Sequence, residues 1–229
     1  MSWLRDVARL AVALVVLSAG PARAAPRSSL AEPSLSPDAR EIAFVSGGDI
    51  WTVPAAGGVA SLLVTDAATE GRPIYSPDGR ELAFTSTRGG YANIYVLTLA
   101  TGKVRRLTWA DATEQLDAWS PDGRHLYFTS PRGDVAGQND LFRVPAQGGT
   151  PMEVSRERYL NEFQAAPSPD GRSLAVMAKG LSSGQWWRNG HAHIDEAELW
   201  VTSLDPAGGY RRLLAGPAKR LWPMWSPDG

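Results

Sequence analysis

Short runs of alternating apolar and polar residues recur along the chain and predict β-strands rather than helices. Four of these runs follow a nearly identical turn sequence, and they occupy residues 41–46, 81–86, 125–130 and 173–178. A later strand in each unit places an aliphatic residue beside an aromatic one, as in Ile50-Trp51, Ile94-Tyr95, Leu141-Phe142 and Leu199-Trp200. Glycines then precede a fourth strand, for example at 103–108 and 210–214. No segment after residue 24 has a convincing helical period, so the pattern predicts an all-β fold.

The turn before each alternating run has the repeated sequence Ser-Pro-Asp-Gly. In such a turn Pro fixes the first central φ, Asp can accept a hydrogen bond from nearby backbone, and Gly adopts a positive φ. The motif serines are Ser36, Ser76, Ser120, Ser168 and Ser226, separated by 40, 44, 48 and 58 residues. Periods in the forties suit one four-stranded propeller blade per repeat. We therefore expect repeats near 33–72, 73–116, 117–164 and 165–222, and the beginning of a fifth at 223–229.

Two repeats depart from the shared pattern. Ala39 replaces the turn glycine of the first repeat, which leaves its turn type open. Val176 stands where the other repeats have Phe, and the fourth repeat also carries a long insertion.

The composite motif resembles the TolB-like relatives of the WD repeat, and the resemblance covers residues 33–229. It implies a β-propeller in which the strand before each turn motif lines the central channel. Propellers close with about four to eight blades, so four complete repeats and the start of a fifth predict an incomplete propeller. We expect the chain to be the N-terminal part of a longer protein. The alternative is a closed ring of four blades in which the fifth segment completes the fourth blade.

The first 24 residues have the order of a secretory signal peptide. Arg5 and Arg9 precede the apolar run at 10–17, and small residues end at Ala22-Arg23-Ala24. The run is too short to span a bilayer as a stable helix. We expect cleavage after Ala24, a mature domain over 25–229, a periplasmic or secreted location, and no integral membrane segment after cleavage. An uncleaved amphipathic anchor is the alternative.

Composition and charge exclude several classes of function. The 229 residues include 23 Lys and Arg, 24 Asp and Glu and no Cys, for a net charge of −1. This balance does not indicate the basic patch of a nucleic-acid-binding protein. Without cysteine the chain can form neither disulfides nor thiolate zinc sites. We expect no cofactor.

A propeller that begins soon after a signal peptide also resembles the N-terminal region of tricorn-like serine peptidases. The segments 47–58 (GGDIWTVPAAGG) and 184–200 (GQWWRNGHAHIDEAELW) strengthen that similarity. In this family the nucleophile lies in a C-terminal core, so the resemblance assigns no catalytic residue to this chain. It implies a non-catalytic propeller that binds or gates peptide substrates and that partners the C-terminal domains of its parent. The alternative is a TolB-like periplasmic scaffold that binds proteins and has no associated enzyme.

A G-x-S-x-G sequence at 180–184 matches the pattern of a nucleophile elbow. That motif requires a preceding strand, a following helix, and acid and His partners in order. No helix is predicted here, and the nearby His residues precede the Asp, so we interpret the match as a flexible loop.

The insertion of the fourth repeat carries a candidate metal site at His191, His193 and Asp195. On a strand these alternate residues would share one face, where a metal with mixed nitrogen and oxygen ligands is conceivable. Solvated loop residues are the more common outcome, and no further ligand is apparent. Trp186 and Trp187 instead suggest that residues 185–198 contact a neighbouring domain or a substrate, since paired indoles bury a large area.

A glutamate recurs six residues before the motif serine, at Glu70, Glu114 and Glu162. If the following strand lines the channel, these carboxylates would form an acidic ring at its mouth that attracts cations or peptide amino termini. The simpler interpretation is that Glu suits a solvated loop.

Overall fold

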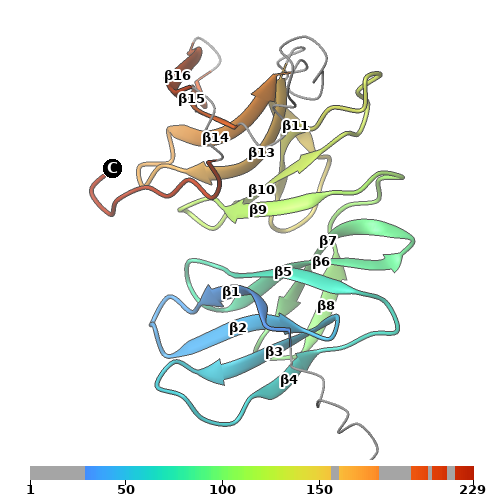
Figure 1. Ribbon diagram of the computed structural model, residues 1–229. Helices are drawn as coiled ribbons and strands as arrows, with labels where there is room; N and C mark the ends of the chain where they lie inside the picture. The colour runs from blue at the N-terminus through green and yellow to red at the C-terminus, as the bar shows by residue number, and fades with distance from the viewer. Residues whose placement is uncertain (1–28, 156–159, 181–196, 206–207, 216–219) are drawn as a thin grey trace, which may run out of the picture.

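A computed structural model describes residues 29–155, 160–180, 197–205, 208–215 and 220–229, which form four antiparallel sheets of four strands each (Figure 1). Blade 1 comprises β1 (Ala31–Leu35), β2 (Glu41–Ser46), β3 (Asp49–Pro54) and β4 (Ser61–Val64). Blade 2 comprises β5 (Glu70–Tyr75), β6 (Glu81–Gly89), β7 (Tyr91–Thr98) and β8 (Lys103–Arg106). Blade 3 comprises β9 (Gln115–Trp119), β10 (His125–Ser130), β11 (Asp140–Pro145) and β12 (Met152–Ser155). Blade 4 comprises β13 (Leu160–Pro167), β14 (Ser173–Gly180), β15 (Glu198–Ser203) and β16 (Tyr210–Leu214).

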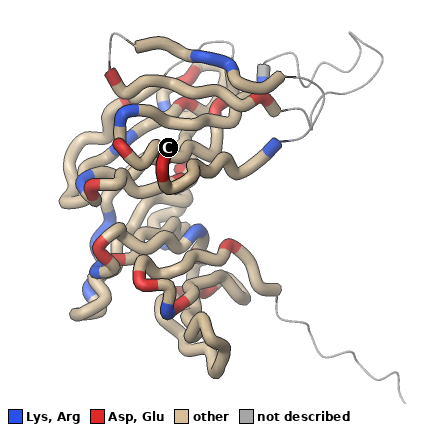
Figure 2. The backbone as a smooth tube through the Cα atoms, turned by 90° about the vertical axis from the view of Figure 1, so that its left-hand side faces the viewer, with Lys and Arg blue, Asp and Glu red and all other residues tan. Residues whose placement is uncertain are grey.

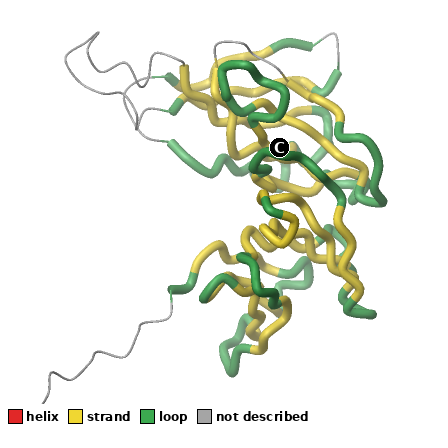
Figure 3. The backbone as a smooth tube through the Cα atoms, turned by 90° about the vertical axis from the view of Figure 1, so that its right-hand side faces the viewer, coloured by secondary structure: helices red, strands yellow, loops and turns green. Residues whose placement is uncertain are grey.

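The predicted all-β fold is confirmed, because the described chain consists of strands and loops (Figure 3). Within each blade every strand pairs with its neighbour in sequence, so each blade is an antiparallel meander. The repeat limits expected from the sequence fall within β5, β9 and β13, since the first strand of a blade leads directly into the turn motif. Among the described residues no helix is long and apolar enough to cross a bilayer.

The turn motif is held by the same hydrogen bonds in the first four repeats. In blade 3 the Ser120 hydroxyl donates to Asp122 Oδ1 at 2.6 Å and accepts from the His125 amide at 2.9 Å. Asp122 Oδ1 also accepts from the Arg124 amide at 3.0 Å. The hydroxyl of the motif serine holds the pKa of each motif aspartate below its usual value. Ala39 adopts a φ of 57° and keeps the corresponding bonds, so the first turn has the same form as the glycine-containing ones.

The hydrophobic core lies between the blades. One cluster joins Ile94 and Leu107 of the second repeat to Leu116 and Phe128 of blade 3, and similar clusters join blades 1 and 2 and blades 3 and 4. Aromatic side chains also stack across paired strands within a blade, since Phe128 of β10 stacks on Phe142 of β11 with ring centroids 5.5 Å apart. The faces that adjacent blades turn toward each other are therefore buried.

The first strands of the blades lie beside one another, β1 next to β5, β5 next to β9 and β9 next to β13. Figure 1 shows blades 1 and 2 in its lower half and blades 3 and 4 in its upper half. Residues 220–229 continue this arrangement, since the Trp225 indole donates to Ala166 O at 2.9 Å just as the Trp119 indole donates to Ile74 O at 3.0 Å.

The described blades form an open arc rather than a closed ring. No strand of blade 4 packs extensively against a strand of blade 1 among the described residues, and blade 4 already takes four strands from 160–214. The alternative of a closed four-bladed ring completed by the fifth segment is therefore wrong. Figure 2 shows acidic and basic residues interspersed over the described chain, in keeping with its nearly balanced charge.

Candidate functional site

The first strand of each blade carries an irregularity at the same place. The residue four positions before the motif serine has a positive φ in four repeats, namely Glu32 (51°), Arg72 (51°), Gln164 (55°) and Trp222 (60°). In β1, β5 and β13 the pairing register shifts at this point, as in a β-bulge. In β9 the register also shifts, because Ala118 pairs with Tyr127 and Leu116 with Phe128, so that Asp117 has no pairing partner. Bulges bend a strand and re-aim its side chains.

These conformations are costly for residues other than glycine. A left-handed residue with a Cβ costs about 1–2 kcal/mol, and such residues cluster at ligand-binding sites. The conformation recurs at one position of the repeat, so the side chains at this position are candidates for a binding site.

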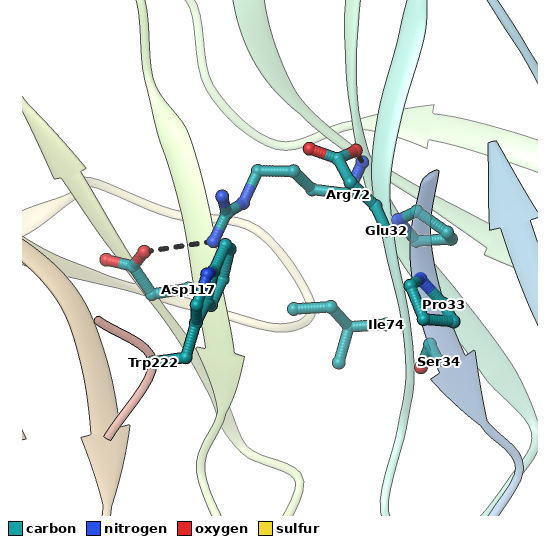
Figure 4. Close-up of a pocket in the computed structure, with 8 residues that line it drawn as sticks. Glu32, Pro33, Ser34, Arg72, Ile74, Asp117 and Trp222 are labelled. Atoms are coloured by element: carbon teal, nitrogen blue, oxygen red, sulfur yellow. Dashed lines mark hydrogen bonds and ion pairs between the residues drawn. The ribbon is translucent and has the colours of Figure 1, made fainter. Parts of the chain in front are cut away.

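A pocket of about 480 Å³ opens where three of these residues, Glu32, Arg72 and Trp222, come together (Figure 4). Its walls come from β1, β5, β9 and the segment 220–229, so four repeats contribute to it. The lining residues are Glu32, Pro33, Ser34, Arg72, Pro73, Ile74, Asp117 and Trp222. The volume lies within the range of small-ligand sites, which is about 300–1,000 Å³.

Arg72 crosses the pocket and is held by several partners (Figure 4). Its Nε donates to Leu116 O, and its Nη2 lies 3.4 Å from Asp117 Oδ1. The guanidinium carbon lies 4.8 Å from the centroid of the Trp222 ring, within reach of a cation–π interaction. The Arg72 amide donates to Glu32 Oε2 at 2.5 Å. The guanidinium is thus fixed before any ligand arrives.

Asp117 is a buried anchor for this arginine. Its side chain has no exposed surface, and its Oδ2 has no hydrogen-bond partner among the described residues. The Thr129 hydroxyl and the Ala165 amide lie near the carboxylate, but neither completes a hydrogen bond to Oδ2. Burial raises the pKa of Asp117 to about 6, against the opposing effect of the Arg72 charge. The carboxylate therefore remains mostly ionised at neutral pH and orients Arg72.

Other lining groups face solvent. Trp222 is 54% exposed, and its amide donates to Gln164 Oε1 at 2.7 Å, which fixes the backbone at this residue. Glu32 and Pro33 are exposed, and the Arg72 side chain is 14% exposed. A ligand that enters the pocket meets the Trp222 indole, proline and isoleucine surfaces, the Arg72 guanidinium and Oε1 of Glu32.

The three recurrent glutamates lie elsewhere. Glu70 and Glu114 are 1% exposed and Glu162 is 0% exposed, and burial raises the pKa of all three. Glu114 accepts hydrogen bonds from Asn93 of β7, from Thr108 just after β8 and from Arg132 just after β10. Its partners thus come from the second and third repeats. The backbone amides of the three glutamates donate to Gly48, Ala92 and Asn139 O in the preceding repeat. An acidic ring and a solvated loop both require exposure that these residues lack, so both interpretations are corrected to a role at the blade junctions.

The remaining expected site residues lie outside the described residues. Trp186, Trp187, His191, His193 and Asp195 fall in the segment 181–196, as does all of the G-x-S-x-G sequence except Gly180 at the end of β14. Within the described parts of the chain, no group of three or more His, Cys, Asp or Glu side chains is placed to hold a metal ion. The expectations for this insertion stay predictions.

The pocket residues were not singled out from the sequence. The position four before the motif serine differs in every repeat, as Glu32, Arg72, Leu116, Gln164 and Trp222. The position before it varies just as much, so the sequence carried no signal that distinguished the pocket residues.

Comparison with known proteins identifies residues 28–229 as a Tricorn protease N-terminal beta propeller domain. The chain belongs to this family. The expected resemblance to tricorn-like and TolB-like propellers is thereby confirmed for the fold and the domain type. No curated protein gave a significant match to the sequence.

Solved structures extend the similarity of this Tricorn-type propeller. TolB from Acinetobacter baumannii is 23% identical with a TM-score of 0.66, over 82% of this chain and 44% of that one. A protein assigned as TolB from Agrobacterium tumefaciens is 21% identical with a TM-score of 0.64, over 88% and 87% of the two chains. An oligogalacturonate lyase in complex with manganese is 14% identical with a TM-score of 0.60, over 82% and 53%. The Tricorn-type propeller thus spans less than half of the A. baumannii TolB, and these likenesses concern the fold alone.

Proposed function

We propose that this chain is a non-catalytic propeller that binds peptide segments in the pocket between Arg72 and Trp222. The observation that carries the proposal is the exposed indole of Trp222 stacked on a guanidinium that Asp117 and Leu116 O hold in place. Aromatic and Arg side chains dominate the binding energy of peptide and protein interfaces. A pocket of about 480 Å³ suits a short chain segment rather than the surface of a folded domain.

We also propose that the chain is exported and that it is part of a longer protein. The signal-like order of residues 1–24 supports a periplasmic or secreted location after cleavage at Ala24. The family assignment supports a parent in which this propeller positions or gates peptides for a serine peptidase in further C-terminal domains. Under this proposal the chain contributes no nucleophile and needs no cofactor.

A second candidate is a scaffold for protein partners without an enzyme. The similarity to the A. tumefaciens TolB-type structure, which this chain covers over 87% of its length, favours this alternative. The two candidates differ in ligand, since a scaffold would bind a folded partner and a gating propeller would bind peptides.

Peptide binding can be measured by fluorescence anisotropy with dye-labelled peptides of four to eight residues. We expect binding by the chain, a loss of at least tenfold in affinity for Trp222→Ala, and intact peptides by mass spectrometry after incubation. Trp109→Ala is the matched control, because Trp109 is 65% exposed and lies outside the pocket. Binding only to folded proteins would favour the scaffold, and cleavage of the peptides would contradict both candidates.

A further inference from the structure

We infer that the pocket recognises the amino-terminal residue of a peptide, with the α-ammonium group at Glu32, an apolar first side chain against Trp222, and the first carbonyl at Arg72. This inference rests on the proposed peptide-binding function and specifies its ligand. Three independent features of the pocket lead to it: its charge balance, its apolar walls and the Nη1 group of Arg72, which has no partner among the described residues.

The charge balance of the pocket calls for one positive charge on the ligand. Among the lining residues Glu32 and Asp117 are acidic and Arg72 is basic, which leaves a net charge of −1. Asp117 is already compensated, because it is buried against the guanidinium of Arg72. Glu32 is exposed, and its only hydrogen bond within the described chain comes from the neutral Arg72 amide to Oε2. Its second oxygen can therefore accept a hydrogen bond from an ammonium group.

The walls beside Glu32 are apolar. Pro33 follows Glu32 directly, Ile74 is partly buried on β5, and the Trp222 indole stands across the pocket from both (Figure 4). Apolar atoms that leave water for such a surface contribute roughly 25 cal/mol per Å². A hydrated ion alone would gain nothing from these walls, whereas an apolar side chain carried next to an ammonium group would contact them.

Arg72 supplies the third point of contact. Its Nε and Nη2 are occupied by Leu116 O and Asp117 Oδ1, and its Nη1 has no partner among the described residues. Because Trp222 and Asp117 fix the plane of the guanidinium, the two N–H groups of Nη1 have fixed directions in that plane and can donate to a ligand oxygen. A peptide carbonyl is a neutral acceptor and adds no charge to a pocket whose arginine is already paired. An amino-terminal residue contains the ammonium, the side chain and the carbonyl in adjacent positions.

The test compares three peptides at pH 7.5 by isothermal titration calorimetry with the full chain. The first is Leu-Ala-Ala-Ala amide, the second is its N-acetylated form, and the third is an N-acetylated peptide with an internal Lys. We expect the free peptide to bind at least tenfold more tightly than either acetylated peptide. The variant Glu32→Gln should reduce that ratio to less than about twofold.

Glu32→Gln is a mild substitution. Gln can still accept the bond from the Arg72 amide, and Gln164 has the same left-handed conformation in blade 4. Asp111→Asn is the matched control for charge, since Asp111 is exposed and lies outside the pocket. It should keep the full preference for the free amino terminus. Circular dichroism melting curves of the variants check that each is folded.

Each result separates the inference from the function on which it rests. Equal binding of free and acetylated peptides would overturn the inference and leave peptide binding in place. Equally tight binding of the acetylated Lys peptide would show a general amine site, and would also overturn it. Absence of binding by all three peptides to the folded chain would contradict the proposed function itself.

Discussion

Asp117 lies in an environment that is unfavourable for a carboxylate. A carboxylate without exposed surface loses its hydration, and only one of its oxygens has a hydrogen-bond partner in return. Such a group is retained at the expense of stability when it positions another residue. Here it holds Arg72 against Trp222, so Asp117 acts through Arg72 and does not itself meet a ligand.

Replacing Asp117 with Asn should change how stability depends on pH. The pKa of Asp117 is raised from 3.8 to about 6 by burial, so the folded state binds the proton more tightly than the unfolded state. The stability that protonated Asp117 contributes is complete below pH 3.8 and is lost as the pH rises through 6. Relative to Asp117→Asn, the wild type should therefore lose up to about 3 kcal/mol of unfolding free energy between pH 4 and pH 7.

Urea denaturation at intervals of one pH unit measures this difference. Asp78→Asn is the control, because the pKa of Asp78 is lowered by the Ser76 hydroxyl, so its effect falls below pH 4. The difference between wild type and Asp78→Asn should stay nearly constant from pH 4 to pH 7. A constant difference for Asp117→Asn as well would contradict the assigned pKa.

At the scale of the element, the turn motif is the most regular part of the molecule. Its glycine has a φ of 69°, 70° and 68° in the second, third and fourth repeats, and Ala39 has 57° in the first. The hydrogen bonds between Ser36 and Glu41 are thus formed although Ala39 is strained in the left-handed conformation. One turn of the propeller is less stable than its counterparts.

Exchanging the two residue types should shift stability in opposite directions. Ala39→Gly should raise the unfolding free energy by about 0.5–1 kcal/mol, since it removes the strain while adding some freedom to the unfolded chain. Gly123→Ala should lower it by about 1 kcal/mol through strain alone, because a Cβ at Gly123 meets no atom closer than 3.9 Å. Chemical denaturation of both variants provides the measurement. Equal signs for the two changes would contradict this account.

The elements also show what the sequence could and could not predict. The strands after each turn motif, β2, β6, β10 and β14, follow a local two-residue pattern and were predicted closely. The bulges of β1, β5 and β13 were not predicted, because left-handed Glu32, Arg72 and Gln164 have no local signal such as glycine. The glutamates near these strands were noticed as a repeat, but the sequence could not show that the blade junctions enclose them.

At the scale of the whole molecule, stability depends on contacts between blades. The hydrophobic clusters join one blade to the next, and the Trp119 indole ties β9 to β5 through Ile74 O. The number and order of the blades could be predicted because the repeat is local. The pocket could not, since it unites residues from Glu32 to Trp222 that meet only when several blades are stacked.

Trp119→Phe should therefore destabilise the whole propeller. Phe keeps most of the apolar contact but cannot donate a hydrogen bond to Ile74 O. A carbonyl left without its hydrogen bond lowers the unfolding free energy by about 1–2 kcal/mol. Trp109→Phe is the matched control, since the Trp109 indole has no hydrogen bond to any described residue and its side chain is 65% exposed. This substitution should cost less than about 0.5 kcal/mol. Thermal unfolding followed by near-ultraviolet circular dichroism distinguishes the two. Equal losses would show that the tie between the blades does not contribute.

The bulge that recurs in the first strands separates the side chains of the pocket from the pairing that holds the sheets together. The bulges of β1 and β5 present Glu32 and Arg72 to the pocket, while each sheet is held by main-chain pairing on either side of the bulge. Duplicated blades can thus diverge at this single position without losing their ability to stack. Glutamate, arginine, glutamine and tryptophan already occupy it in one chain. The lining of the pocket can thus change by one codon per blade while the pairing of the strands stays the same.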